Sequence, residues 1–261
     1  MISKNETLAD EVLDAHEIEQ APVDVFGIAT RENISLCPVT KCSSDFFGRI
    51  EYHTEVNRFL LYYPDNLDAA ETRVRFSVAH ELGHFFIPEH REVLMSGKTH
   101  NSQPGFFCDE PMEREADAFA AALLIPSILL EKKMARDSVL TLEQVLAVAK
   151  ECNASRECSA IRYTKFTEEP CVVVISENGV VKYGIPSDEA NAMGYWISKG
   201  SKIPTCSAAS STDSTTNITE KKFCSKTWFP TSFREIDMWE ESISLGYGGL
   251  ILTMLSWDAV D

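Results

Sequence analysis

The chain has too few basic residues for a general nucleic-acid-binding protein. Its 261 residues include 24 Lys and Arg against 40 Asp and Glu, which gives a formal net charge of -16. Because a phosphate backbone is bound by clustered Lys and Arg, this balance argues against broad DNA or RNA binding, although it leaves room for a local basic patch.

Long apolar runs are also missing. Residues 1–20 contain no apolar core of signal-peptide length, and no later stretch approaches the roughly 20 apolar residues that a membrane-spanning helix needs. The eight cysteines form no CxxC pair of the kind found in zinc knuckles or redox sites, and no internal repeat is present. We therefore expect a soluble, cytoplasmic protein with reduced thiols.

What the sequence does contain is enough apolar material, 44% of the residues, for real hydrophobic cores. The length favours a catalytic domain with one or two smaller appendages. Residue patterns predict helices over 7–20, about 69–87, 109–125, 142–152 and 155–166, strands within 46–63, and a β-hairpin over 171–183. Residues 88–108 and 205–219 are predicted to be loops, and 228–257 is predicted to form a strand, a short helix and a strand.

The chemically informative motif lies in the helix predicted at 69–87. Residues 80–84 read His-Glu-Leu-Gly-His, so His80 and His84 stand on one helical face and can hold one metal ion. Glu81 lies beside them, where it can accept a proton from a water molecule as general base. Gly83 costs roughly 1 kcal/mol relative to Ala in a helix interior, which predicts that another segment approaches closely there.

A catalytic zinc site needs a third protein ligand. The helix predicted at 109–125 begins with several acids, and we favour Glu113 over Glu115, because Glu115 shares its helical face with residues expected in the core. Asp117 lies one turn after Glu113 and is expected to accept a hydrogen bond from the outer nitrogen of a liganding histidine. Two imidazoles and a carboxylate suit Zn²⁺, while manganese and iron remain open.

Other groups around the metal stay undecided at this point. The loop histidines His90 and His100 are expected to be solvated rather than to bind the metal. Either of them, His53 or Tyr163 is a candidate for stabilising the oxyanion, and the sequence does not choose among them.

The two motifs together resemble the ImmA/IrrE family of bacterial metallopeptidases. RFSVAHELGHFFIP is followed by EREADAFAAALLIP, and the second motif runs from Glu113 through Asp117 to Pro126. The resemblance covers roughly residues 10–165. It implies a zincin-like, gluzincin-type fold with zinc on His80, His84 and Glu113, and with Glu81 as base. It also implies a protein substrate, a helix-turn-helix repressor of the XRE type whose cleavage relieves repression of stress-response or mobile-element genes.

The expected architecture is α+β, in three parts. Residues 1–130 would form the zincin-like metallopeptidase domain and 131–166 a small helical segment similar to a helix-turn-helix. Residues 167–261 would form a mixed α/β domain with a sensory or substrate-docking role, or a structural cap. The alternative function is a non-catalytic, metal-containing regulatory protein that binds DNA or a partner. The middle helices argue against strong DNA binding, since acids are at least as frequent as basic residues in 136–169.

Overall fold

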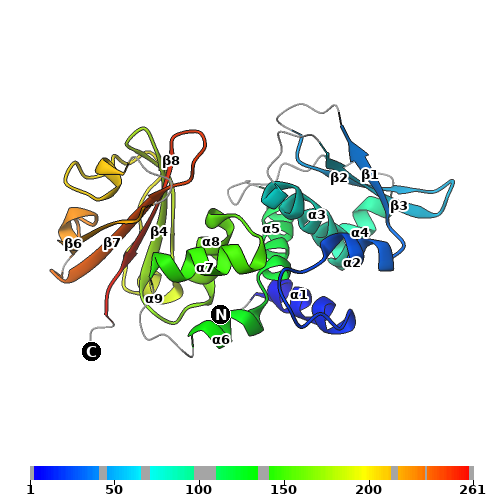
Figure 1. Cartoon of the computed structure of the whole chain (residues 1–261), viewed down its shortest axis with the longest axis horizontal. Helices are drawn as coiled ribbons and strands as arrows, with labels where there is room; N and C mark the ends of the chain where they lie inside the picture. Colours follow the sequence, from blue (N-terminus) through cyan, green and yellow to red (C-terminus); the bar gives the residue numbers. More distant parts are fainter. Residues whose placement is uncertain are drawn as a thin grey trace. The chain divides into compact units, whose positions relative to one another are not determined.

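The computed structural model describes residues 3–40, 46–65, 71–96, 110–134, 141–212, 217–232 and 234–258. Its residues divide into two compact units. The N-terminal unit comprises Ile2–Ser127 with Lys150–Ser155, and the C-terminal unit comprises Ile128–Ala149 with Arg156–Asp261. The chain is α+β, with helices in both units and one sheet in each (Figure 1).

The N-terminal unit joins a small sheet to a helical layer. Its elements are α1 (Lys4–Ala15), α2 (Val25–Arg31), β1 (Ser35–Val39), β2 (Arg49–His53), β3 (Arg58–Pro64), α3 (Glu71–Phe86), α4 (Pro88–Met95) and α5 (Pro111–Leu124). The strand order is β1-β3-β2, with β1 parallel and β2 antiparallel to β3. The antiparallel pair confirms the strands predicted within 46–63.

Helix α3 lies at the centre of this unit. It packs against α5 and also contacts β2, β3 and α4. Near its first turns, the buried Arg75 donates hydrogen bonds to the backbone oxygens of Val23, Cys152 and Asn153. These bonds fasten segments that are far apart in the sequence to one helix, so α3 provides a rigid base for the side chains that it carries.

Gly83 shows why α3 and α5 approach so closely. A Cβ atom at this position would lie 3.1 Å from the Cα atom and 3.2 Å from the backbone oxygen of Ala116 in α5. The expectation that another segment approaches Gly83 is confirmed.

The C-terminal unit is built on an antiparallel five-stranded sheet with strand order β5-β4-β8-β7-β6. The strands are β4 (Cys171–Glu177), β5 (Val180–Pro186), β6 (Thr219–Cys224), β7 (Asp237–Ser244) and β8 (Leu250–Ser256). The helices are α6 (Ser127–Met134), which begins at the boundary, α7 (Leu142–Cys152), α8 (Arg156–Phe166) and α9 (Asp188–Ala192), with short 3-10 turns at Ala209–Ser211 and Ser225–Thr227. The predicted hairpin is confirmed as β4 and β5.

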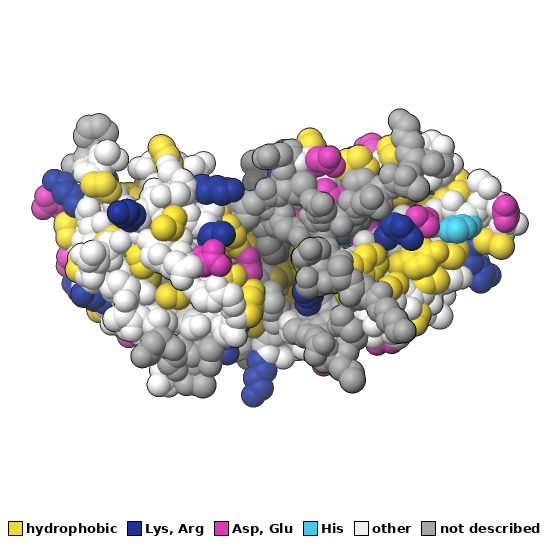
Figure 2. Space-filling view, turned by 90° about the horizontal axis from the view of Figure 1, so that it is seen from above, with side chains coloured by type: hydrophobic (Ala, Val, Ile, Leu, Met, Phe, Trp, Pro, Cys, Tyr) yellow, Lys and Arg dark blue, Asp and Glu magenta, His cyan; other side chains and the backbone are white. Residues whose placement is uncertain are grey.

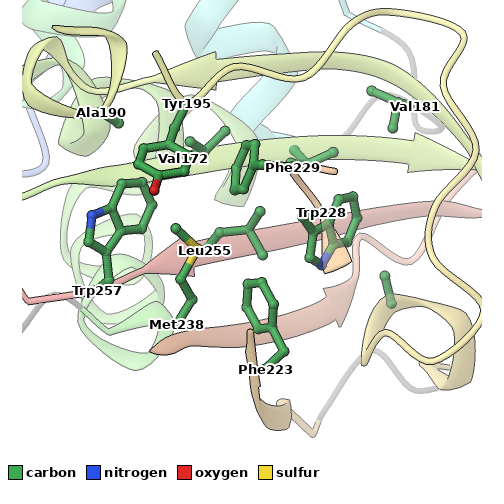
Figure 3. Packing of buried hydrophobic residues seen from close by; sticks show 12 residues of the cluster. Val172, Val181, Ala190, Tyr195, Phe223, Trp228, Phe229, Met238, Leu255 and Trp257 are labelled. Carbon is green, nitrogen blue, oxygen red and sulfur yellow. The ribbon is translucent and has the colours of Figure 1, made fainter. Parts of the chain in front are cut away.

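Both faces of β4 are covered, because Cys171–Ser176 are all buried. Val172 and Val174 point into an aromatic cluster that includes Tyr195, Phe229 and Trp257 (Figure 3). Alternate side chains of a strand point to opposite faces, so Cys171 faces α8, where its thiol contacts Thr164. Burial is the main reason why the pKa of Cys171 is raised to about 12, so this thiol stays protonated.

Two predictions about elements were wrong, and two strands were not predicted. Residues 88–95 form α4 rather than a loop, since Pro88 ends one helix and occupies the first turn of the next. Strand β1 was not foreseen, and β6 begins at Thr219, where a loop was predicted to end. Within the described part of 228–257 no helix separates the strands, because β7 and β8 are adjacent antiparallel strands. The predicted N-cap Asp109 lies outside the described residues, and α5 is preceded by Glu110.

Among the described helices, none combines the length and apolar character that crossing a bilayer requires. All six cysteines in the described ranges are free thiols.

Candidate metal centre

Three buried side chains from two helices converge in the N-terminal unit. His80 and His84 come from α3, Glu113 comes from the first turn of α5, and all three are at most 1% exposed. Their nearest ligand atoms lie close together: His80 Nε2 to His84 Nε2 is 3.1 Å, His84 Nε2 to Glu113 Oε1 is 3.2 Å, and His80 Nε2 to Glu113 Oε2 is 3.5 Å. The structure thus brings together the three residues predicted to hold a metal.

These spacings are of the size expected among the ligands of one metal ion. For bonds of about 2.0–2.1 Å, as zinc makes to histidine and carboxylate, the ligand atoms of a tetrahedron lie about 3.3–3.4 Å apart. The two histidine nitrogens lie 3.1 Å apart, and they lie 3.2 and 3.5 Å from different oxygens of Glu113, so the distances are close to this value.

The charges around the cluster favour a cation. Asp117 Oδ1 lies 2.8 Å from His80 Nδ1, and both groups are buried. Burial, the largest influence, lowers the pKa of His80, but hydrogen bonds to Asp117 and Glu113 outweigh it and raise the pKa to about 10. The carboxylates that would hold a proton on this imidazole also stabilise positive charge at the centre of the cluster.

Glu81 lies next to the cluster and is completely buried. Gly48, just before β2, approaches it so closely that a Cβ atom there would lie 2.8 Å from Glu81 Oε1. The carboxylate keeps its place because residue 48 has no side chain. A single sequence gives no signal for this contact.

The contact between His84 and His90 was not predicted. His90 was expected to be a solvated loop residue, but it lies in α4, is 1% exposed, and its Nδ1 is 3.1 Å from His84 Nδ1. His90 Nε2 in turn lies 2.9 Å from Glu115 Oε2. The series of contacts from His84 through His90 therefore ends at the Glu115 carboxylate, whose side chain is 47% exposed.

This contact corrects the argument about Glu115, although not the preference for Glu113. Glu115 was placed toward the core, whereas the structure leaves it half exposed beside α4. After Glu115 nearly all residues of α5 are buried, whichever side of the helix they lie on. Sharing a helical face with the buried Phe119 therefore did not show whether Glu115 itself is buried.

The remaining candidates lie elsewhere. His53 is on β2 with a side chain 42% exposed, 3.4 Å from Glu51. Tyr163 belongs to α8 in the C-terminal unit and contacts Gln144. His100 lies outside the described residues.

Of the comparisons with known proteins, the match to a family model points to a peptidase. No match was found among curated proteins. A solved structure named "Mycobacterium tuberculosis transcriptional regulator" is similar over 98% of this chain and 88% of its own, with a TM-score of 0.63 and 12% sequence identity, which shows a shared fold. Residues 47–164, which contain both helices of the metal centre, match the peptidase family described as "IrrE N-terminal-like domain". Over this segment the chain is thus similar to the IrrE N-terminal-like peptidase family, Peptidase_M78.

Proposed function

We propose that the protein is a zinc-dependent endopeptidase in which His80, His84 and Glu113 hold the metal and Glu81 is the general base. The observation that carries this proposal is the convergence of three buried metal-ligating side chains, with ligand atoms within 4.8 Å of one another, beside a buried glutamate. A zincin-like, gluzincin-type site of this composition supports metal-assisted hydrolysis of a peptide bond.

Each residue has a distinct task. Bound zinc would lower the pKa of a water molecule and polarise the scissile carbonyl. Glu81 accepts the proton of the attacking water and passes it to the leaving amine, a role for which Gly48 keeps its carboxylate in position. Asp117 fixes the orientation and tautomer of His80 through the 2.8 Å contact.

His90 and Glu115 fix the orientation and tautomer of the other liganding histidine, His84. If His84 uses Nε2 for the metal, its Nδ1 carries the proton and donates it to His90 Nδ1. His90 then carries its own proton on Nε2 and donates it to Glu115. Each liganding imidazole is thus oriented by a separate hydrogen-bond partner, Asp117 for one and the His90–Glu115 pair for the other.

Replacing His90 should therefore weaken the metal site without removing a ligand. Mutation of a group that orients a metal ligand typically costs 10- to 100-fold in affinity, so we expect His90→Ala to reduce zinc affinity by about that factor. Competition with a chelator of known affinity measures the change, and the visible spectrum of the cobalt-substituted protein reports altered ligand geometry. Zinc affinity equal to that of the parent would show that His84 needs no such partner. His53→Ala, a change at an exposed histidine in the same unit, is the control.

The substrate that we propose is a helix-turn-helix repressor of the XRE type, whose cleavage would relieve repression of stress-response genes. The resemblance of the His80–His84 and Glu113–Pro126 segments to ImmA/IrrE peptidases supports this class. Residues 1–130 would carry the chemistry, 131–166 would be a helical segment similar to a helix-turn-helix, and 167–261 would serve sensing or docking.

The experiment that tests this function uses the purified, zinc-loaded chain and a repressor encoded beside its gene. Discrete fragments are expected, and chelation should abolish them. An intact repressor after long incubation with zinc-loaded protein would favour the alternative, a non-catalytic regulator. In that case duplex DNA should give a sequence-specific gel shift, which the scattered Lys and Arg side chains in the described surface of Figure 2 do not favour.

A further inference from the structure

The C-terminal unit contains a cavity of about 990 Å³ that is separate from the metal centre. It lies between two segments of this unit, residues 193–204 after α9 and residues 227–234 before β7. A volume of this size suits a small molecule, since ligand pockets are typically about 300–1,000 Å³.

Aromatic side chains form much of the lining. Tyr195, Trp228 and Phe229 are buried and contribute both to the lining and to the aromatic cluster seen in Figure 3. Trp196 also lines the cavity but is 62% exposed. A large exposed aromatic ring beside a cavity is available for stacking on a flat ligand.

The charged residues that line the cavity are positive, although the chain as a whole has a negative net charge. Of the 261 residues 40 are acidic, yet no acidic residue is among those that line the cavity, whereas Lys202 and Arg234 both do. Two lysines outside the cavity do have ion-pair partners, since Lys222 pairs with Asp237 and Lys226 with Glu235. Within the described ranges Lys202 and Arg234 form no ion pair, so their charges are available to an anion.

Described residues of the two segments contact one another directly. The hydroxyl of Ser232 donates to that of Tyr195 at 3.1 Å, which joins one segment to the other. The Ser225 hydroxyl donates to the backbone oxygen of Arg234 at 2.9 Å, and the Tyr195 and Phe229 rings lie 4.9 Å apart edge to face. Binding therefore requires little ordering of these segments, which favours affinity.

We propose that this cavity binds a small anion carrying a flat aromatic ring system, with Lys202 and Arg234 binding the anionic group and Trp196 stacking on the ring. The anion can be a phosphate or a carboxylate, because both chemistries suit a guanidinium and an ammonium group. The inference is independent of the peptidase chemistry, since binding needs neither zinc nor Glu81.

The test titrates the intact chain with matched pairs of probes, followed by ligand-observed NMR. One pair is adenosine monophosphate with adenosine, and the other is 2-naphthoate with the uncharged 2-naphthalenemethanol. We expect saturable binding of at least one anion, about tenfold tighter than its uncharged counterpart. The pair that shows this preference identifies the anionic group.

Variants then assign the residues. Lys202→Gln and Arg234→Gln are each expected to weaken anion binding about three- to tenfold, whereas Lys222→Gln, outside the cavity, should leave it unchanged. Trp196→Ala should weaken the charged and the uncharged probe alike. Three results would overturn the proposal: no saturable binding of either anion, equal binding of charged and uncharged probes, or an equal loss in Lys222→Gln.

Discussion

Glu81→Gln is expected to retain zinc and to slow cleavage of the protein substrate by at least about 10²- to 10⁴-fold, the usual contribution of a general base. The amide is nearly the same size as the carboxylate, so the buried position next to Gly48 still accommodates it. It cannot accept a proton at neutral pH, so the attacking water keeps its proton. The variant should still bind the substrate and leave it intact over times in which the parent cleaves all of it.

Zinc content and cleavage must be measured on the same sample. Cleavage at nearly the parental rate would mean that another group is the base. Loss of zinc together with activity would assign Glu81 a structural role in the site. Glu11→Gln is a matched control, because it makes the same chemical change at an exposed carboxylate of α1 in the same unit, away from the groups that hold or orient the metal ligands.

Removing a metal ligand should have the largest effect on zinc itself. His80→Ala and His84→Ala are each expected to lower zinc affinity by more than the roughly 100-fold that loss of an orienting partner can cost, since a ligand is lost outright. The parent should carry about one zinc per chain, measured by elemental analysis after dialysis, and neither variant should retain it. Glu113→Gln should follow the same direction, because an amide oxygen is a weaker ligand than a carboxylate.

The controls separate the metal centre from general damage. His53→Ala removes an exposed histidine of the same unit and should keep its zinc. Circular dichroism checks that His80→Ala is folded. Full zinc content in both ligand variants would reject this site.

The sequence could predict that His80, His84 and Glu113 cluster, because the signals for this are local. The spacing of His80 and His84 is set by one helix, and Glu113 begins the next strong helical pattern. The preference for Glu113 survives, although the reason given against Glu115 was wrong. A helical face tells which residues lie together, but not which neighbour covers that face.

The misses have a common physical cause, which is tertiary packing that overrides local signals. Pro88 is a stop signal and equally a good first residue of a helix, so α4 and the buried His90 were read as a loop. In β1, Pro38 argues against a strand, yet β1 is an edge strand, where a missing backbone N–H is tolerated. The approach of Gly48 to Glu81 joins residues from a strand border and a helix, and only the folded chain shows it.

The close approach at Gly83 also bears on how the proposed metal site is built. Since the backbones of α3 and α5 meet at Gly83 and Ala116, packing rather than ligation sets the separation of the histidine pair from Glu113. If the proposed site binds zinc, the packing of these two helices would hold its ligands at the required spacing.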